Sequence, residues 1–302
     1  MKKFIVRTIS LLFVASFAAL ILITFFAKIN EEKIDFFYRR FTSRHYGGLI
    51  VGTSRAAQII EAKLIHPEQY NFAFTIQHSP FDLTYFELIK KFHPVQKFNH
   101  QRKHIVCVDP WSIRTFHSNQ YENKNQIFEP ILKFPVCNPN LNYLIAFCKV
   151  EDVFFTNGLL SNTKLNDKGR LEVYIDSVHT LSFDDLKSEK IREKLGDYKR
   201  KIEFRNGYIS EVRLQNLENI ISYLERDGDV SLCRLPISKA MYDMEMEINP
   251  NFDSIMNSVC LKHKIKYINL IGDSPSYRYT DGNHIWNGQS AKITYKILSQ
   301  IK

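Results

Sequence analysis

The chain has 302 residues, of which 44% are hydrophobic and 24% charged, and a formal net charge of +9 from 41 Lys and Arg against 32 Asp and Glu. This composition excludes a wholly disordered chain, and the length suffices for one sizeable α/β domain or two small ones. The net positive charge favours anionic lipid head groups or acidic glycans as partners. The basic residues are mixed with acids in runs such as KSEKIREKLGDYKRK, as on a solvated helix face, and we expect no nucleic-acid partner.

The N-terminal segment differs from the remainder of the chain. Three basic residues precede an uncharged, mostly apolar run over 8–27, which is about the length of 20 residues that a helix needs to cross a bilayer. The positive charges on the short side predict a cytoplasmic N-terminus and an extracytoplasmic main domain. A cleaved signal peptide is the alternative, although two phenylalanines fit poorly before a cut after Ala27. We expect residues 1–28 to form one transmembrane anchor and residues 29–46 a connector.

From Gly47 onward, strand-like and helix-like segments alternate. Short apolar runs bounded by Gly, Pro or Asp predict strands, and apolar residues at spacings of three to five predict helices. Such strands are typical of a parallel sheet covered on both faces. The predicted strands cover 47–52, 70–74, 103–109, 229–236 and 265–272, and the predicted helices cover 55–64, 80–92, 211–227, 251–264 and 287–302. The pattern predicts an α/β domain over 47–302 with a five-stranded parallel sheet.

The middle of the chain is less regular and predicts an insertion over about 112–227, after the third strand. Within it, residues 140–150 have a helical pattern and residues 170–175 a strand pattern. The five cysteines are scattered without C-x-x-C spacing, so we expect no metal site. Cys107 and Cys233 lie in strand-like runs, and we expect both to be buried as small hydrophobic side chains. Phosphate-binding glycine motifs are missing after every predicted strand, so we expect no cofactor.

The first predicted strand ends in the turn of LIVGTSRAAQI, residues 49–59. Gly52, Ser54 and Ala56 are small residues at alternate positions, close to the G-x-S-x-G elbow that presents a nucleophile, with Ala in place of the last Gly. A strand-to-helix turn of this kind exposes its central side chain at the carboxyl edge of the sheet, where ligands of open α/β folds bind. The same serine also fits an ordinary helix N-cap.

A base and an orienting carboxylate stand near the other end of the chain. A serine needs a base to take its proton, and a third group orients that base. Asp281 and His284 in TDGNHIWNG lie between the last predicted strand and the terminal helix, at the same sheet edge as Ser54. A second D-x-x-H, at Asp176 and His179, falls in the insertion and predicts a solvated pair. Ser274 of a second G-x-S is disfavoured because no predicted helix follows it.

Gly52-Thr53-Ser54 after the first strand and Asp281-x-x-His284 before the terminal helix resemble the SGNH (GDSL-like) hydrolase superfamily, and most closely its membrane-anchored, extracytoplasmic branch. The resemblance covers about 250 residues from Gly47, and only these two blocks are specific. It implies a flavodoxin-like three-layer α/β/α sandwich with Ser54 as nucleophile, His284 as base and Asp281 as the group that orients it.

The sequence departs from the family around the oxyanion hole. The first block has Thr53 where the family has Asp, the Gly expected after the second strand is missing, and Asp109 stands where the family has Asn. Because a carboxylate repels an oxyanion, the donors must come from elsewhere. The candidates for the oxyanion and substrate contacts are Gly52, Asn71, Ile76, Gln77, Asp109 and Arg114.

These patterns lead to two hypotheses. The first is a membrane-anchored serine esterase or O-acyltransferase that acts on acyl esters, with acetyl the expected group, of a cell-envelope or surface polysaccharide. A membrane acyl-donor protein is a further expected partner in the transferase case. The second is a non-catalytic accessory or binding protein of a surface-polysaccharide system that keeps the fold with a degraded oxyanion hole. The sharpest point of difference is whether donors converge beside Ser54.

Overall fold

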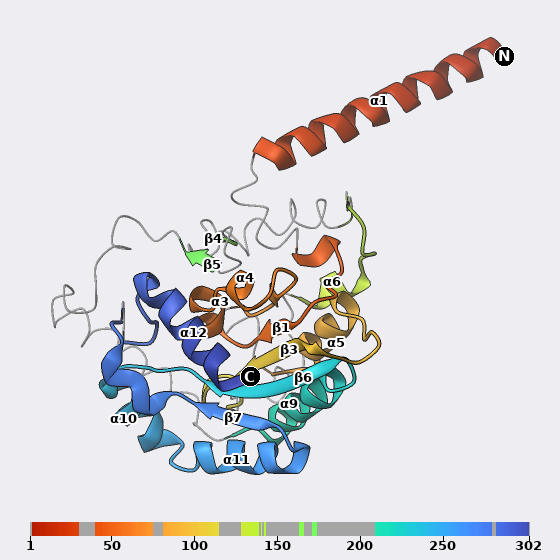
Figure 1. The fold of residues 1–302 in the computed structure, drawn as a ribbon. Helices are drawn as coiled ribbons and strands as arrows, with labels where there is room; N and C mark the ends of the chain where they lie inside the picture. Colours follow the sequence, from red (N-terminus) through yellow and green to blue (C-terminus); the bar gives the residue numbers. More distant parts are fainter. Residues whose placement is uncertain are drawn as a thin grey trace.

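The computed structural model describes residues 2–29, 40–74, 81–114, 128–138, 140, 142, 163–165, 171–173, 209–279 and 282–301. A five-stranded sheet forms its centre (Figure 1), and every neighbouring pair of strands in it is parallel. The strands are β1 Leu49–Val51, β2 Tyr70–Asn71, β3 Asn99–Cys107, β6 Gly228–Arg234 and β7 Lys266–Asn269. The predicted α/β class and five-stranded parallel sheet are confirmed.

The order of the strands across the sheet is β2-β1-β3-β6-β7, which is 2-1-3-4-5 when these strands are numbered along the chain. The chain therefore adds β2 on one side of β1 and all later strands on the other side. The connections that leave the carboxyl ends of β1 and β3 diverge at this reversal. In open α/β sheets such a point is where ligands bind.

Helices cover both faces of the sheet, as the apolar strands require. Leu49, Ile50 and Val51 of β1 are all fully buried. Figure 1 shows one group of mutually contacting helices on one side of the sheet and a second group on the other. The first group is α3 Ser54–Ile59, α4 Ala62–Ile65 and α12 Ser290–Ile301, and the second is α5 Leu83–Phe92, α9 Glu211–Leu224 and α11 Phe252–His263.

The sequence pattern misjudged two elements. The predicted helix over 55–64 is two helices, because Ile60 is extended and the Glu61 N–H donates to Thr294 Oγ1 of α12 at 3.0 Å. A further helix, α10 Lys239–Ile248, was not predicted. Its N-cap is Ser238, whose side chain accepts a hydrogen bond from the Met241 N–H. That serine is the local signal by which the sequence could have revealed α10.

The boundaries of the insertion also differ from those expected. α9, which the pattern placed inside it, packs against α5 and β6 and connects β3 to β6. The other described elements within 112–227 are the short helix α6 Glu129–Lys133 and an antiparallel pair of strands, β4 Thr163–Leu165 and β5 Leu171–Val173. β5 matches the predicted strand over 170–175 and contacts α3. The predicted helix over 140–150 lies almost wholly outside the described residues.

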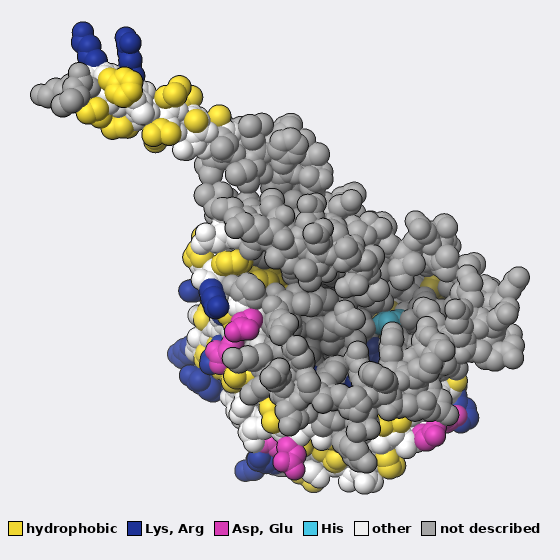
Figure 2. Space-filling view, turned by 180° about the vertical axis from the view of Figure 1, so that it is seen from behind, with side chains coloured by type: hydrophobic (Ala, Val, Ile, Leu, Met, Phe, Trp, Pro, Cys, Tyr) yellow, Lys and Arg dark blue, Asp and Glu magenta, His cyan; other side chains and the backbone are white. Residues whose placement is uncertain are grey.

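The N-terminal segment is a single helix, α1 Lys2–Ile29. Its side chains over 3–18 are exposed, and Figure 2 shows hydrophobic groups along it with basic groups near its free end. Within the part of the chain that the structure describes, none of the helices combines the length and the apolar character of a membrane span.

Cys107, Cys233 and Cys260 are free thiols. Cys107 of β3 and Cys233 of β6 are neighbours in the sheet register, and both are buried. Burial raises the pKa of Cys107 well above its ordinary value. The expectation that these two residues act as small buried hydrophobes is confirmed; Cys148 lies outside the described residues.

Candidate functional site

The turn between β1 and α3 depends on Gly52. This residue has φ +142°, in a region that side chains rarely adopt, and an added Cβ would lie 2.7 Å from the carbonyl oxygen of Cys107. Its N–H donates to the Tyr85 hydroxyl at 3.2 Å. Thr53 follows in extended conformation as the N-cap, so Ser54 is the first residue of α3. The interpretation of Ser54 as an N-cap is therefore wrong.

Ser54 lies beside His284, and Ser54 Oγ is 2.8 Å from His284 Nε2. Both side chains are half-buried, so the pair is supported by the fold and still open to solvent. A serine hydroxyl that donates to a neutral imidazole nitrogen at this distance is in the arrangement that general-base activation requires. The structure thus brings together two side chains that are 230 residues apart in the sequence.

The loop that carries His284 runs from β7 to α12 and is anchored at two points. An antiparallel bridge joins Tyr279 and Ile285 on either side of it. The carbonyl of Gly282, which has φ +79°, accepts a hydrogen bond of 3.0 Å from the Ser238 N–H at the start of α10. These contacts hold His284 at the carboxyl edge of the sheet, where the sequence predicted it.

Several predicted residues lie outside the described residues: Asp281, Ile76, Gln77, Asp176 and His179. The rival serine, Ser274, is in a 3-10 helix over Ile271–Ser276. Its Oγ is buried, and no hydrogen-bond partner for it occurs among the described residues. Ser54, in contrast, has a histidine nitrogen at 2.8 Å.

Asp109 holds the turn in place from the neighbouring strand. It follows β3, which pairs with β1, and its Oδ2 accepts a hydrogen bond of 2.6 Å from Thr53 Oγ1. Its Oδ1 accepts a second bond of 2.9 Å from the Ser112 N–H. Both carboxylate oxygens of this buried side chain therefore orient the loops after β1 and β3. The Thr53 hydroxyl supplies the hydrogen that an aspartate at that position would lack.

The Asn71 side-chain amide forms hydrogen bonds with the backbone, including that of α3. Its Nδ2 donates to the carbonyl oxygen of Ala56 at 3.1 Å, and its Oδ1 accepts from the Ala73 N–H at 3.1 Å. The side chain is buried, with 1% of its surface exposed. These contacts tie the end of β2 to α3, so the amide stabilises the helix that begins with Ser54.

The residue after the serine, Arg55, links α3 to two distant segments. Arg55 Nε donates to Asn283 Oδ1 at 2.7 Å, and Arg55 Nη2 donates to Glu245 Oε1 of α10. Glu245 also accepts hydrogen bonds from Trp111 Nε1 at 2.7 Å and from Arg234 Nη2 at 3.0 Å. All five side chains are buried. Trp111 is thus a buried partner of this network.

The arginines hydrogen-bonded to Glu245 stay charged although they are buried. Burial by itself would lower the pKa of Arg55, but the carboxylates of Glu245 and Asp109 more than offset it, and the pKa is raised. The pKa of Arg234 is raised against the same burial by Glu245 and Asp253. Buried charges persist only when they are paired and hydrogen-bonded. Arg55 therefore faces its partners as a guanidinium with donors only.

One group of described residues has the composition of a metal site: His93, His104 and Asp227, whose ligand atoms lie within 4.8 Å of one another. The Leu49 N–H donates to His104 Nδ1 at 3.1 Å, so the proton of the neutral ring is on Nε2, which faces Asp227 Oδ2 at 3.4 Å. His93 Nε2 lies 2.8 Å from the same oxygen. Protein hydrogen bonds thus occupy His104 Nδ1 and His93 Nε2, and the protonated His104 Nε2 offers an ion no lone pair. The absence of a metal stays a prediction.

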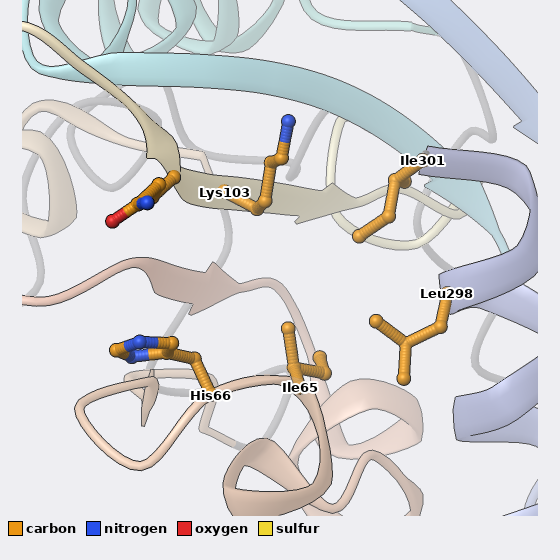
Figure 3. Close-up of a pocket in the computed structure, with 6 residues that line it drawn as sticks. Ile65, His66, Lys103, Leu298 and Ile301 are labelled. Atoms are coloured by element: carbon orange, nitrogen blue, oxygen red, sulfur yellow. The ribbon is translucent and has the colours of Figure 1, made fainter.

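A cavity of about 370 Å³ lies away from the serine. It is lined by Ile65, His66, Gln101, Lys103, Leu298 and Ile301, which come from the end of α4, from β3 and from α12 (Figure 3). Gln101 and Lys103 are in the first half of β3, whereas the loop that carries Asp109 follows its end. The cavity therefore lies toward the amino edge of the sheet and contains none of the predicted site residues.

Sequence reasoning missed Arg55, Glu245 and Asn283. Arg55 and Asn283 are direct neighbours of Ser54 and His284, so proximity in sequence was the signal that could have found them. Glu245 had no such signal because it belongs to α10, the helix that the pattern did not predict. A comparison of the chain with protein-family models and with curated proteins finds no match.

Proposed function

We propose that this chain is a serine esterase or O-acyltransferase of SGNH-like type, with Ser54 as nucleophile and His284 as base. The observation that carries the proposal is the distance of 2.8 Å between Ser54 Oγ and His284 Nε2 at the carboxyl edge of the sheet. The strand order 2-1-3-4-5, which is that of flavodoxin-like folds, and the helices on both faces support the resemblance to that superfamily.

The reaction would proceed in two halves. Ser54 Oγ attacks the acyl carbonyl carbon while its proton passes to His284 Nε2, and the carbonyl oxygen becomes an oxyanion. When the tetrahedral intermediate collapses, His284 returns the proton to the departing alcohol oxygen, and the acyl group stays on Ser54. Water or a sugar hydroxyl then gives its proton to His284 and attacks the acyl-serine carbonyl carbon. When the second tetrahedral intermediate collapses, His284 returns that proton to Ser54 Oγ and the acyl product leaves. Asp281 is the proposed group that orients the imidazole.

Several surrounding groups support this role by fixing the serine. Gly52 permits the sharp turn, Asp109 holds Thr53, and Asn71 ties down α3. Reacting groups held in this way avoid part of the entropy cost of reaching the transition state. The backbone N–H of Ser54 is one proposed donor to the oxyanion, and one from the segment around Ile76 is another.

The proposed setting is the outer face of a membrane. The uncharged run over 8–27, behind three basic residues, supports an anchor with a cytoplasmic N-terminus. The proposed substrate is an acylated glycan of the cell envelope or surface, with acetyl as the expected acyl group. A membrane acyl-donor protein would be the partner if the chain transfers the group to a sugar instead of to water.

Covalent labelling tests the nucleophile directly. The full-length chain would be treated with a fluorescent fluorophosphonate and assayed for hydrolysis of p-nitrophenyl acetate. We expect stoichiometric labelling of wild type, no labelling of Ser54→Ala, and a loss of esterase rate of about 10³-fold or more in that variant. Ser258→Ala, which changes an exposed serine of α11, is the matched control and should behave as wild type.

Two outcomes would overturn the proposal. Equal labelling of wild type and Ser54→Ala would place the reactive group elsewhere. A wild-type chain that neither takes the label nor hydrolyses the ester, while it melts cooperatively, would favour a binding protein of the same fold.

A further inference from the structure

The starting point is the orientation of the Asn283 side-chain amide. Its Oδ1 accepts a hydrogen bond of 2.7 Å from Arg55 Nε. Because a guanidinium has only donors, the amide atom that faces it must be the oxygen. Arg55 is held in turn by Glu245, whose carboxylate is buried and accepts three hydrogen bonds. The amide of Asn283 therefore cannot turn over without breaking a buried, charge-assisted contact.

With its oxygen fixed on Arg55, the amide directs its nitrogen toward the reacting pair. Asn283 Nδ2 lies 3.5 Å from His284 Nε2, and this same nitrogen lies 2.8 Å from Ser54 Oγ. An amide N–H thus stands beside the atoms between which the proton passes. Asn283 is 8% exposed, so water competes little for this region.

From this geometry we infer that Asn283 Nδ2 is a side-chain donor to the oxyanion formed when Ser54 attacks an acyl ester. The inference rests on the proposed function and adds a catalytic residue to it. In the resting site, Asn283 Nδ2 and Ser54 Oγ lie 3.5 Å and 2.8 Å from the same atom, His284 Nε2. Once that nitrogen has taken the serine proton, it can no longer accept a hydrogen bond, and the Asn283 amide can donate to the new negative charge instead.

An interaction of this kind favours the transition state over the ground state. A donor that gains its best acceptor only as charge develops lowers the barrier without tightening substrate binding. Such a donor would also replace the Asn that the superfamily has after the third strand. In this chain Asp109 stands there, and its carboxylate accepts a hydrogen bond from Thr53. The side-chain donor would come from the loop that carries the base, and Arg55 would act as the positioning residue that orients it.

Two variants of Asn283 separate the donor from the anchor. Asn283→Asp keeps the size and an oxygen for Arg55 but removes the N–H, and Asn283→Ala removes both. We expect kcat for p-nitrophenyl acetate to fall by about 10²–10³-fold in each, with KM changed by less than about threefold. The affinity for a boronic acid, which forms an anionic tetrahedral adduct on serine, should fall in parallel with kcat/KM. The measurements use the full-length chain, with thermal melting to confirm folding.

Asn249→Ala is the matched control, since this asparagine is also 8% exposed but lies at the far end of α10. It should retain the wild-type rate. If Asn283→Asp and Asn283→Ala both stay within threefold of the wild-type kcat while Ser54→Ala is inactive, the donor role is wrong and the esterase stands. Loss of rate with unchanged boronate affinity would also refute the donor role. A wild-type chain without esterase activity or labelling would overturn both proposals.

Discussion

At the scale of single residues, the candidate site is built by side chains that fix backbone. Asp109 accepts hydrogen bonds from the Thr53 hydroxyl and the Ser112 N–H, so its side chain links the two loops at the reversal point of the sheet. Tyr85 accepts from the Gly52 N–H and donates to the Phe72 carbonyl oxygen at 2.7 Å. Burial raises the pKa of this tyrosine, so its hydroxyl stays protonated and able to donate. The half-buried serine therefore lies on a turn whose neighbouring residues are held by hydrogen bonds.

The glycine of that turn offers a test at this scale. Gly52→Ala would force a Cβ against the Cys107 carbonyl at φ +142°, and we expect a loss of roughly 1–3 kcal/mol in the free energy of unfolding. Because the turn must shift, Ser54 should also label more slowly with the fluorophosphonate. Urea denaturation and labelling rates measure the two effects. Gly272→Ala is the control, since an added Cβ there meets nothing within 4 Å; equal effects at both glycines would contradict this account.

At the scale of elements, α10 joins parts of the fold that the sheet alone does not connect. Its Glu245 receives Arg55 from α3 and Arg234 from β6, and Arg234 also donates to Asp253 of α11 at 2.5 Å. Residues 190 positions apart, Arg55 and Glu245, thus form an ion pair with the two side chains 6% and 1% exposed. The α10 helix fixes the orientation of the helix that begins with Ser54.

Neutralising Glu245 tests this connection. Glu245→Gln preserves the shape of the side chain but leaves Arg55 and Arg234 without its charge in a buried site. We expect the free energy of unfolding to fall by about 3–5 kcal/mol, because a buried charge loses its partner. Urea denaturation of the full-length chain measures it. Asp243→Asn on the same helix breaks an exposed pair with Lys239 and should change stability by less than about 0.5 kcal/mol; a similar small change in Glu245→Gln would refute the structural role.

At the scale of the whole molecule, the two edges of the sheet hold different chemistry. The carboxyl edge carries Ser54 and His284, half-buried and open to solvent. Near the amino edge, His104 and Asp227 are fully buried. Burial lowers the pKa of His104 to about 4 and that of nearby His45 to about 3. Burial opposes the charge of Asp227 as well, but hydrogen bonds from His104 and His93 keep its pKa below the ordinary value.

These shifts predict acid sensitivity of the entire fold. Below the ordinary histidine pKa of 6.5, the unfolded chain binds protons at His104 and His45 that the folded chain excludes. Stability should therefore fall as the pH drops from about 6.5 to 4, and further below about 3.9 as Asp227 also loses its advantage. Urea midpoints between pH 8 and pH 4 measure this loss. His100→Gln, which changes a side chain that is 81% exposed, should leave the slope unaltered; a flat profile in wild type would contradict the assignment.

The sequence by itself determined the strands, most of the helices and the placement of Ser54 and His284 after the first and last strands. Apolar runs, turn residues and helical spacing are local signals, because they record burial and backbone preference over a few positions. Only the tertiary structure decided that these two side chains meet at 2.8 Å, that Asp109 binds Thr53, and that Arg55 orients Asn283. Such contacts join residues from 56 to 230 positions apart, and their partners follow from strand order and loop packing, which no local pattern specifies.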